Sequence, residues 1–226
     1  MKFTFLAGVT ASALILVASQ ALAADYVTPS GSGYKPYVSV FGGAAFLTKN
    51  PHTINTTSAT TSVDVLMNNP GYIIGGAVGV DWGNQFRTEI ELSHARWSSD
   101  KYQNLVSGAV TSTTPYSSVQ SATYVLGNAW YDLTHDTQFT PYVGGGLGIG
   151  FARLDENNGS YVYDATGLAF QLGAGVRFNI SENVSIDAGY RFKDIVGLKY
   201  NASNGYLLTD TSLASHNFQV GLTLRF

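Results

Sequence analysis

The residues most able to take part in chemistry are charged side chains that recur at alternate positions of the chain. Each group of them lies opposite a row of apolar residues. They are Arg87, Glu89, Glu91, Arg177, Asp187, Arg191 and Arg225. Acids and bases gathered in this way could form ion pairs, line the filter of a narrow channel, or act as a general acid and base. Because a period of two sends successive side chains to opposite faces of a strand, the pattern predicts strands with one charged and one apolar face.

Other chemistry has little support in the sequence. The histidines are His52, His94, His135 and His216, and none has a metal-ligand partner two or four residues away. Ser93 precedes His94, but neighbours on one strand point to opposite faces, so they do not form a Ser–His pair. We therefore expect a protein that is not an enzyme, with no catalytic residues, no metal site and no cofactor.

The clearest of the strands that must position these charges is the last one, residues 216–226. Its apolar residues Phe218, Val220, Leu222, Leu224 and Phe226 alternate with polar or small ones. A tilted strand needs about 9–11 residues to cross a bilayer, which matches this length. The segment therefore predicts a strand that presents its apolar face to lipid.

Seven further segments show strand character and complete an expected set of eight. The expected strands are 34–47, 71–82, 85–97, 117–132, 138–152, 167–179, 184–192 and 216–226. The facing of 117–132 is ambiguous, and we favour Asn128 and Asp132 pointing inward. Short turns alternate with long polar segments at 48–70, 98–117, 153–166 and 193–215, which we interpret as loops. Long loops on one side and short turns on the other are typical of outer-membrane barrels.

Membrane energetics decides which face of these strands is the inner one. A Lys or Arg on the lipid-facing surface costs about 2–4 kcal/mol at the bilayer midplane, so the charged face must line the interior. An eight-stranded barrel is just wide enough for side chains to fill. We therefore expect the seven charges to pair with one another and to plug the barrel, and the alternative is a narrow channel for small solutes.

Aromatic residues are expected to form belts at the two membrane interfaces. The belt beside the short turns is expected to contain Trp82, Phe86, Tyr131, Phe139 and Phe178, together with the terminal Phe226. The belt beside the long loops is expected to contain Phe46, Tyr72, Trp97, Phe151 and Phe192.

The start of the chain and its composition indicate export. Residues 1–23 form an expected signal peptide, with Lys2 at its start, an apolar stretch and a small-x-small site at 21–23, followed by one domain over 24–226. Charged residues make up only 12% of the chain, glycine is abundant at 25 residues, and cysteine is absent. A net charge of −3 gives no basic surface for nucleic acid.

Several motifs along the mature chain together resemble a known family. They are residues 128–132, 140–148, 170–177, 187–192 and the terminal Phe226. Their order is similar to that of the small eight-stranded outer-membrane β-barrels: the OmpA-type transmembrane domain and the opacity-like "porin family" surface antigens. The resemblance covers essentially the whole mature chain. It implies an all-β protein, an eight-stranded antiparallel up-and-down transmembrane β-barrel in the outer membrane of a Gram-negative cell.

The resemblance also implies partners. These are outer-membrane lipid and lipopolysaccharide, the barrel-assembly machinery, and a host or environmental ligand at the loops. The assembly machinery of such proteins reads a C-terminal aromatic strand, which assigns that role here to Phe218 and Phe226. The leading expectation is thus a non-enzymatic structural and surface-interaction barrel that presents four long extracellular loops.

Overall fold

The computed structural model describes residues 33–48, 52–56, 59–65, 70–106, 109–133, 138–156, 161–201 and 207–226. The expected signal peptide at 1–23 and His135 lie outside the described residues. Over the described ranges, the structure holds no helix that is long and apolar enough to span a membrane.

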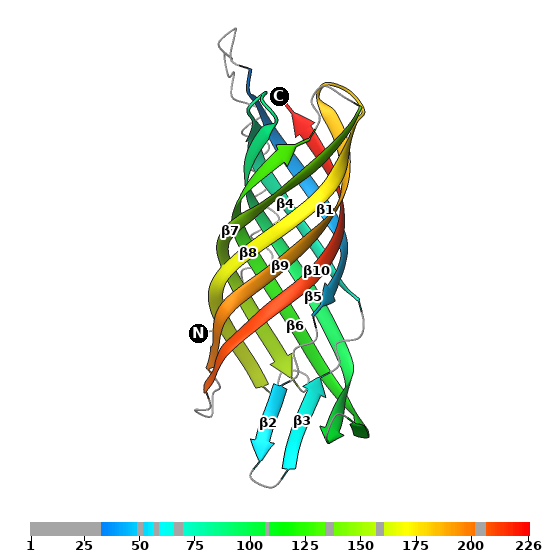
Figure 1. The fold of residues 1–226 in the computed structure, drawn as a ribbon, viewed down its shortest axis with the longest axis vertical. Coiled ribbons are helices and arrows are strands. Elements are labelled where there is room, and N and C mark those ends of the chain that lie inside the picture. Colours follow the sequence, from blue (N-terminus) through cyan, green and yellow to red (C-terminus); the bar gives the residue numbers. More distant parts are fainter. Residues whose placement is uncertain are drawn as a thin grey trace.

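The described chain consists of strands that follow one another around a cylinder (Figure 1). In chain order they are β1 (Lys35–Leu47), β2 (His52–Thr56), β3 (Ala59–Val65), β4 (Gly71–Asp81), β5 (Phe86–Val106), β6 (Ala109–Asp132), β7 (Phe139–Glu156), β8 (Tyr161–Asn179), β9 (Val184–Asn201) and β10 (Leu207–Arg225). Eight of them form the barrel wall, and β2 with β3 forms an extra hairpin. All pairings are antiparallel, and the eight wall strands pair with their neighbours in chain order.

The first and last strands close the barrel. β1 pairs with β10 in continuous register from Tyr37 opposite Arg225 to Leu47 opposite Ser215. Among the described strands of the wall, none is left with an unpaired edge, because β1 also pairs with β4 and β10 also pairs with β9. The expected fold class, an eight-stranded antiparallel up-and-down barrel, is confirmed.

Exposure alternates residue by residue along β10. Phe218, Val220, Leu222 and Leu224 are 57%, 59%, 40% and 44% exposed on the outer face. The intervening positions are buried in the lumen, among them Arg225 at 8%. The same alternation resolves the facing of β6, where Asn128 and Asp132 lie inside, as favoured from the sequence, and Val125 lies outside.

The four segments interpreted as long loops are largely strand, so this interpretation was wrong in detail. β5 and β6 run on as a paired hairpin to Val106 and Ala109, and β7–β8 and β9–β10 extend in the same way. The β2–β3 hairpin then adds to the extension of β5. Ladder hydrogen bonds continue wherever two strands lie side by side, whether or not an apolar face accompanies them.

The lumen has an apolar layer toward the long-hairpin end. It is made of Trp97, Tyr124, Leu126, Ile73, Ile195, Leu198 and Leu213 with several alanines. Trp97 is 1% exposed and its indole Nε1–H donates to the carbonyl of Ala45 at 3.1 Å. Its expected place in the outer aromatic belt was therefore wrong. Position 97 has the same inward parity as Glu89 and Glu91. The Trp97 ring therefore packs against the apolar side chains of the lumen and not against lipid.

Candidate functional site in the barrel lumen

The polar part of the lumen is built in three layers, and the first lies at the short-turn end. There Asp132 on β6 receives two arginines. Arg87 donates to the Asp132 carboxylate from both Nε and Nη2 at 2.9–3.1 Å, and Arg177 donates from Nη1 at 3.3 Å. Asp132 thus holds together two like charges that would otherwise repel. Nearby, Arg225 Nε lies 3.7 Å from Asp81 Oδ2.

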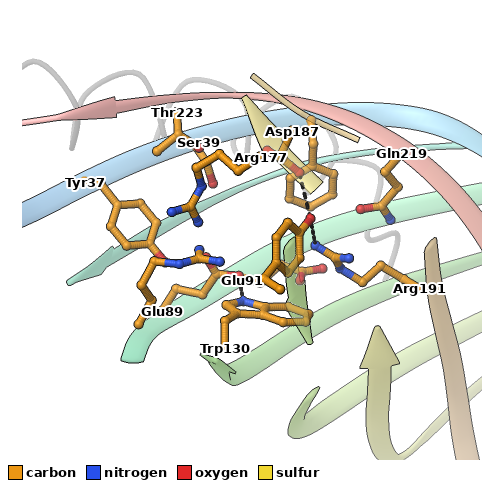
Figure 2. Close-up of a pocket in the computed structure, with 13 residues that line it drawn as sticks. Tyr37, Ser39, Glu89, Glu91, Trp130, Arg177, Asp187, Arg191, Gln219 and Thr223 are labelled. Carbon is orange, nitrogen blue, oxygen red and sulfur yellow. Dashed lines mark hydrogen bonds between the residues drawn. The ribbon is translucent and has the colours of Figure 1, made fainter. Parts of the chain in front are cut away.

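The second layer binds its charges mainly through aromatic residues (Figure 2). Glu89 accepts hydrogen bonds from the Tyr37 hydroxyl at 2.7 Å and from the Trp130 indole at 2.8 Å. Tyr142 accepts from Arg191 Nη2 at 2.9 Å and donates to Asp187 Oδ1 at 3.0 Å, so its hydroxyl joins a base to an acid.

The guanidinium of Arg191 also lies over an indole ring in this layer. Its Cζ is 4.2 Å from the centre of the Trp130 ring, close enough for a cation–π contact. Trp130 thus contacts Arg191 through its ring, and Tyr142 accepts a hydrogen bond from it. The charge of Arg191 is therefore stabilised by aromatic side chains and not by a direct ion pair with a described carboxylate.

The third layer is centred on Glu91. Its carboxylate accepts from Lys193 Nζ at 2.5 Å, from Ser93 at 2.6 Å, from Gln171 at 2.7 Å and from Asn128 at 3.0 Å. Lys193 is completely buried and lies 5.1 Å from the ring centre of Tyr124, at the boundary with the apolar layer. Both carboxylate oxygens of Glu91 thus have several donors, as a buried ion requires.

The structure brings all seven residues singled out from the sequence into this lumen, and it adds three partners. Lys193, Asp132 and Asp81 each form an ion pair that the expected set of seven lacks. Lys193 was assigned to a loop because the apolar row of β9 ends at Phe192. The inward parity of Asp187 and Arg191 continues to position 193 and was the signal that could have found it.

Charge in the described part of the lumen balances. Five bases, Arg87, Arg177, Arg191, Lys193 and Arg225, face five acids, Glu89, Glu91, Asp132, Asp187 and Asp81, so the formal sum is zero. Between the first and second layers the side chains leave a cavity of about 30 Å³. That is room for one or two water molecules at about the minimum volume each needs.

Aromatic side chains ring the outside of the barrel at the short-turn end. Trp82, Phe86 and Phe139 are 49%, 51% and 60% exposed. Two ring pairs link neighbouring strands there: Phe86 with Tyr131 at 5.1 Å and Phe139 with Phe178 at 5.0 Å between centroids. The terminal Phe226 is 46% exposed at the same end, and its backbone N–H donates to the carbonyl of Pro36 on β1.

The histidines that the structure describes with their side chains lie on the outer wall. His94 Nδ1 is 2.9 Å from the Thr123 hydroxyl, and His216 Nδ1 is 2.6 Å from the Tyr190 hydroxyl. Ser93 points into the lumen, away from His94. Within the described ranges, no group of three or more His, Cys, Asp or Glu residues could hold a metal ion.

Comparison with known proteins agrees with this architecture. The family model described as "Outer membrane protein beta-barrel domain" matches residues 9–226. The chain belongs to this family. A closed wall with an apolar outer face and with its ion pairs inside suits a protein that spans a bilayer. Membership of this family places the chain in the outer membrane of a Gram-negative cell.

Individual relatives are distant. The chain is similar to outer membrane protein PagN of Salmonella typhimurium, with 26% identity over 172 residues, covering 67% of this chain and 72% of that protein. It is also 26% identical over 158 residues to an uncharacterised protein of Brucella suis, covering 60% of this chain and 54% of that protein. Among solved structures, Neisserial surface protein A shares the fold, with a TM-score of 0.54, 19% identity, and 86% and 98% of the two chains covered.

Proposed function

We propose that this member of the outer-membrane family is a non-enzymatic surface protein: a barrel plugged by its own ion-pair network, which carries long hairpins into the extracellular space. The observation that supports the plug most strongly is the charge-balanced set of ion-paired side chains in the lumen, which lines a cavity of only about 30 Å³. A conducting pore would need a continuous water path past the three polar layers and the apolar layer.

The hairpins support the surface role. β5 and β6 contain 21 and 24 residues, whereas about 9–11 suffice to cross the bilayer. At least ten residues of each strand thus extend beyond the membrane, which at about 3.3 Å per residue and a tilt of about 40° is a projection of at least roughly 25 Å. Ser, Thr, Asn and Tyr are frequent there, and such residues suit adaptable polar contacts with a host or environmental ligand.

Planar-bilayer recording tests the plug. We expect the folded wild-type protein to give no steady single-channel conductance, because the ion-paired side chains and the apolar layer occupy the lumen that a solute would have to cross. Steady conductance of the wild type that is lost in Glu91→Gln would overturn the plug and establish a narrow solute channel instead.

Epitope tags test which end of the barrel is outside. A tag inserted between Val106 and Ala109, at the tip of the β5–β6 hairpin, should bind antibody on intact cells. A tag inserted at Glu182, in the turn between β8 and β9, should bind only after the outer membrane is permeabilised. The reverse pattern, or equal labelling of both tags on intact cells, would contradict the proposed orientation.

A further inference from the structure

The outer wall across β5, β6 and β7 changes chemical character over three successive rows of side chains. The row Leu92, Val125 and Ile149 is apolar, and the next row is His94, Thr123 and Phe151. The third row is Arg96, Ser121 and Arg153, all facing outward. Rows on one face of a strand are about 6.6 Å apart, so the surface passes from hydrocarbon-like to cationic over about two such steps.

The two arginines of the third row flank a cleft. Ser121 pairs with Arg96 on one side and with Arg153 on the other, so the arginines lie two strand spacings, about 10 Å, apart at their Cα atoms. The cleft has a volume of about 360 Å³ and is lined by Arg96, Arg153, Ser121, Ser117, Val119 and Asp155. Two long guanidinium side chains on either side of a hydroxyl can converge on one tetrahedral anion.

The position of this cleft along the barrel axis indicates which class of ligand it binds. Phe151, one row below, is 48% exposed at the upper edge of the apolar surface, which includes Ile149 at 51% and Leu147 at 66%. A group bound by Arg96 and Arg153 therefore lies just outside the hydrocarbon, at the depth of lipid headgroups.

We propose that Arg96, Ser121 and Arg153 form a binding site for the phosphorylated sugar headgroup of an outer-leaflet glycolipid. The proposal rests on the membrane orientation given under the proposed function. The two guanidinium groups bind the phosphate, the Ser121 hydroxyl adds a hydrogen bond, and the acyl chains lie along the apolar rows below.

Two carboxylates lie near this site. Asp164 on β8 is 3.6 Å from Arg153, but the two side chains are 70% and 48% exposed, so this pair is weak and a phosphate can compete with it. Asp155 lines the cleft itself. Carboxylates and phosphates commonly share a divalent cation, so Asp155 is compatible with a phosphate that brings Mg²⁺.

Binding of lipid A by the folded protein in phosphatidylcholine nanodiscs tests the site. The probes are bisphosphorylated lipid A and the same lipid after enzymatic removal of its phosphates, with Mg²⁺ present. We expect the wild type to bind the phosphorylated form at least tenfold more tightly, since charge-assisted hydrogen bonds are lost with the phosphates. The double variant R96Q/R153Q should bring that ratio close to one, and K199Q, an exposed cation on β9, should leave it unchanged.

Each other outcome overturns the assignment. An unchanged ratio in R96Q/R153Q would mean that the phosphate binds elsewhere. Binding of inorganic phosphate alone that R96Q/R153Q abolishes, with equal binding of the two lipid A forms by the wild type, would identify a free-anion site. Binding of heparin that R96Q/R153Q abolishes, with lipid A binding intact, would identify a site for a sulfated glycan. Heat-modifiable migration of R96Q/R153Q shows that the barrel is folded, so failure here leaves the proposed surface function standing.

Discussion

Replacing Lys193 by methionine lowers the free energy of unfolding by about 3–5 kcal/mol, because Glu91 is then a buried carboxylate without a counter-ion. Lys193 and Glu91 are 0% and 4% exposed at their side chains, so water cannot take over the role of the lost ammonium. Urea titration of the refolded protein in lipid vesicles, followed by tryptophan fluorescence, measures the loss.

A second variant separates the lost charge from lost packing. In K193M/E91Q both charges are gone, and the amide introduced at position 91 can keep hydrogen bonds with Ser93, Gln171 and Asn128, so most of the stability should return. The exposed pair Arg153–Asp164 provides the matched control, and D164N should change stability by less than about 1 kcal/mol. Equal effects of K193M and D164N would show that the lumen does not isolate Glu91 from water.

Deleting Phe226 prevents most of the protein from assembling in the outer membrane while leaving its export intact. The deletion removes an outward aromatic ring and the backbone N–H that bonds to Pro36 on β1, at the seam where the barrel closes. An insertion signal at the C-terminus, as the family resemblance implies, would be lost as well. We expect at least a tenfold fall in heat-modifiable barrel in membrane fractions, with the unassembled chain recovered from the periplasm.

The control for this deletion keeps the length of the chain. Phe226→Tyr retains an aromatic ring and the backbone N–H, and should assemble normally; Phe218→Ser, which places a polar group on the outer face of the same strand, should be intermediate. Normal amounts of heat-modifiable barrel after deletion of Phe226 would contradict the role of the terminal residue.

The sequence predicted the facing of strands wherever one face meets lipid and the other meets charge. In 216–226 one parity carries every large apolar residue, and in 85–92 one parity carries the charges Arg87, Glu89 and Glu91, and the structure follows that parity. The pattern is absent from the sequence of the extended β5–β6 hairpin, which no lipid-facing surface constrains. With no apolar row on either face, the alternation that identifies a strand disappears although the backbone ladder continues.

Which side chains contact one another in the lumen was harder to predict than which charged residues line it. Ile73 and Ile74 are both apolar, yet one is fully buried inside and the other is 56% exposed outside, so composition alone does not reveal the apolar layer. Similarly, no local pattern assigns Asp132 to both Arg87 and Arg177, which come from strands far apart in the sequence. Such partners are decided by the register and by the shear of the closed barrel.

A single-cysteine scan of β10 tests the central claim most directly, that the outer wall is apolar where it spans the membrane while the charges within the span face the lumen. The chain contains no cysteine, so each variant from 217 to 225 carries one spin label and no background. We expect labels at 218, 220, 222 and 224 to show high accessibility to oxygen, which partitions into the bilayer, and labels at 217, 219, 221, 223 and 225 to show low accessibility. Accessibility without a period of two, or highest at 219, 223 and 225, would contradict the account.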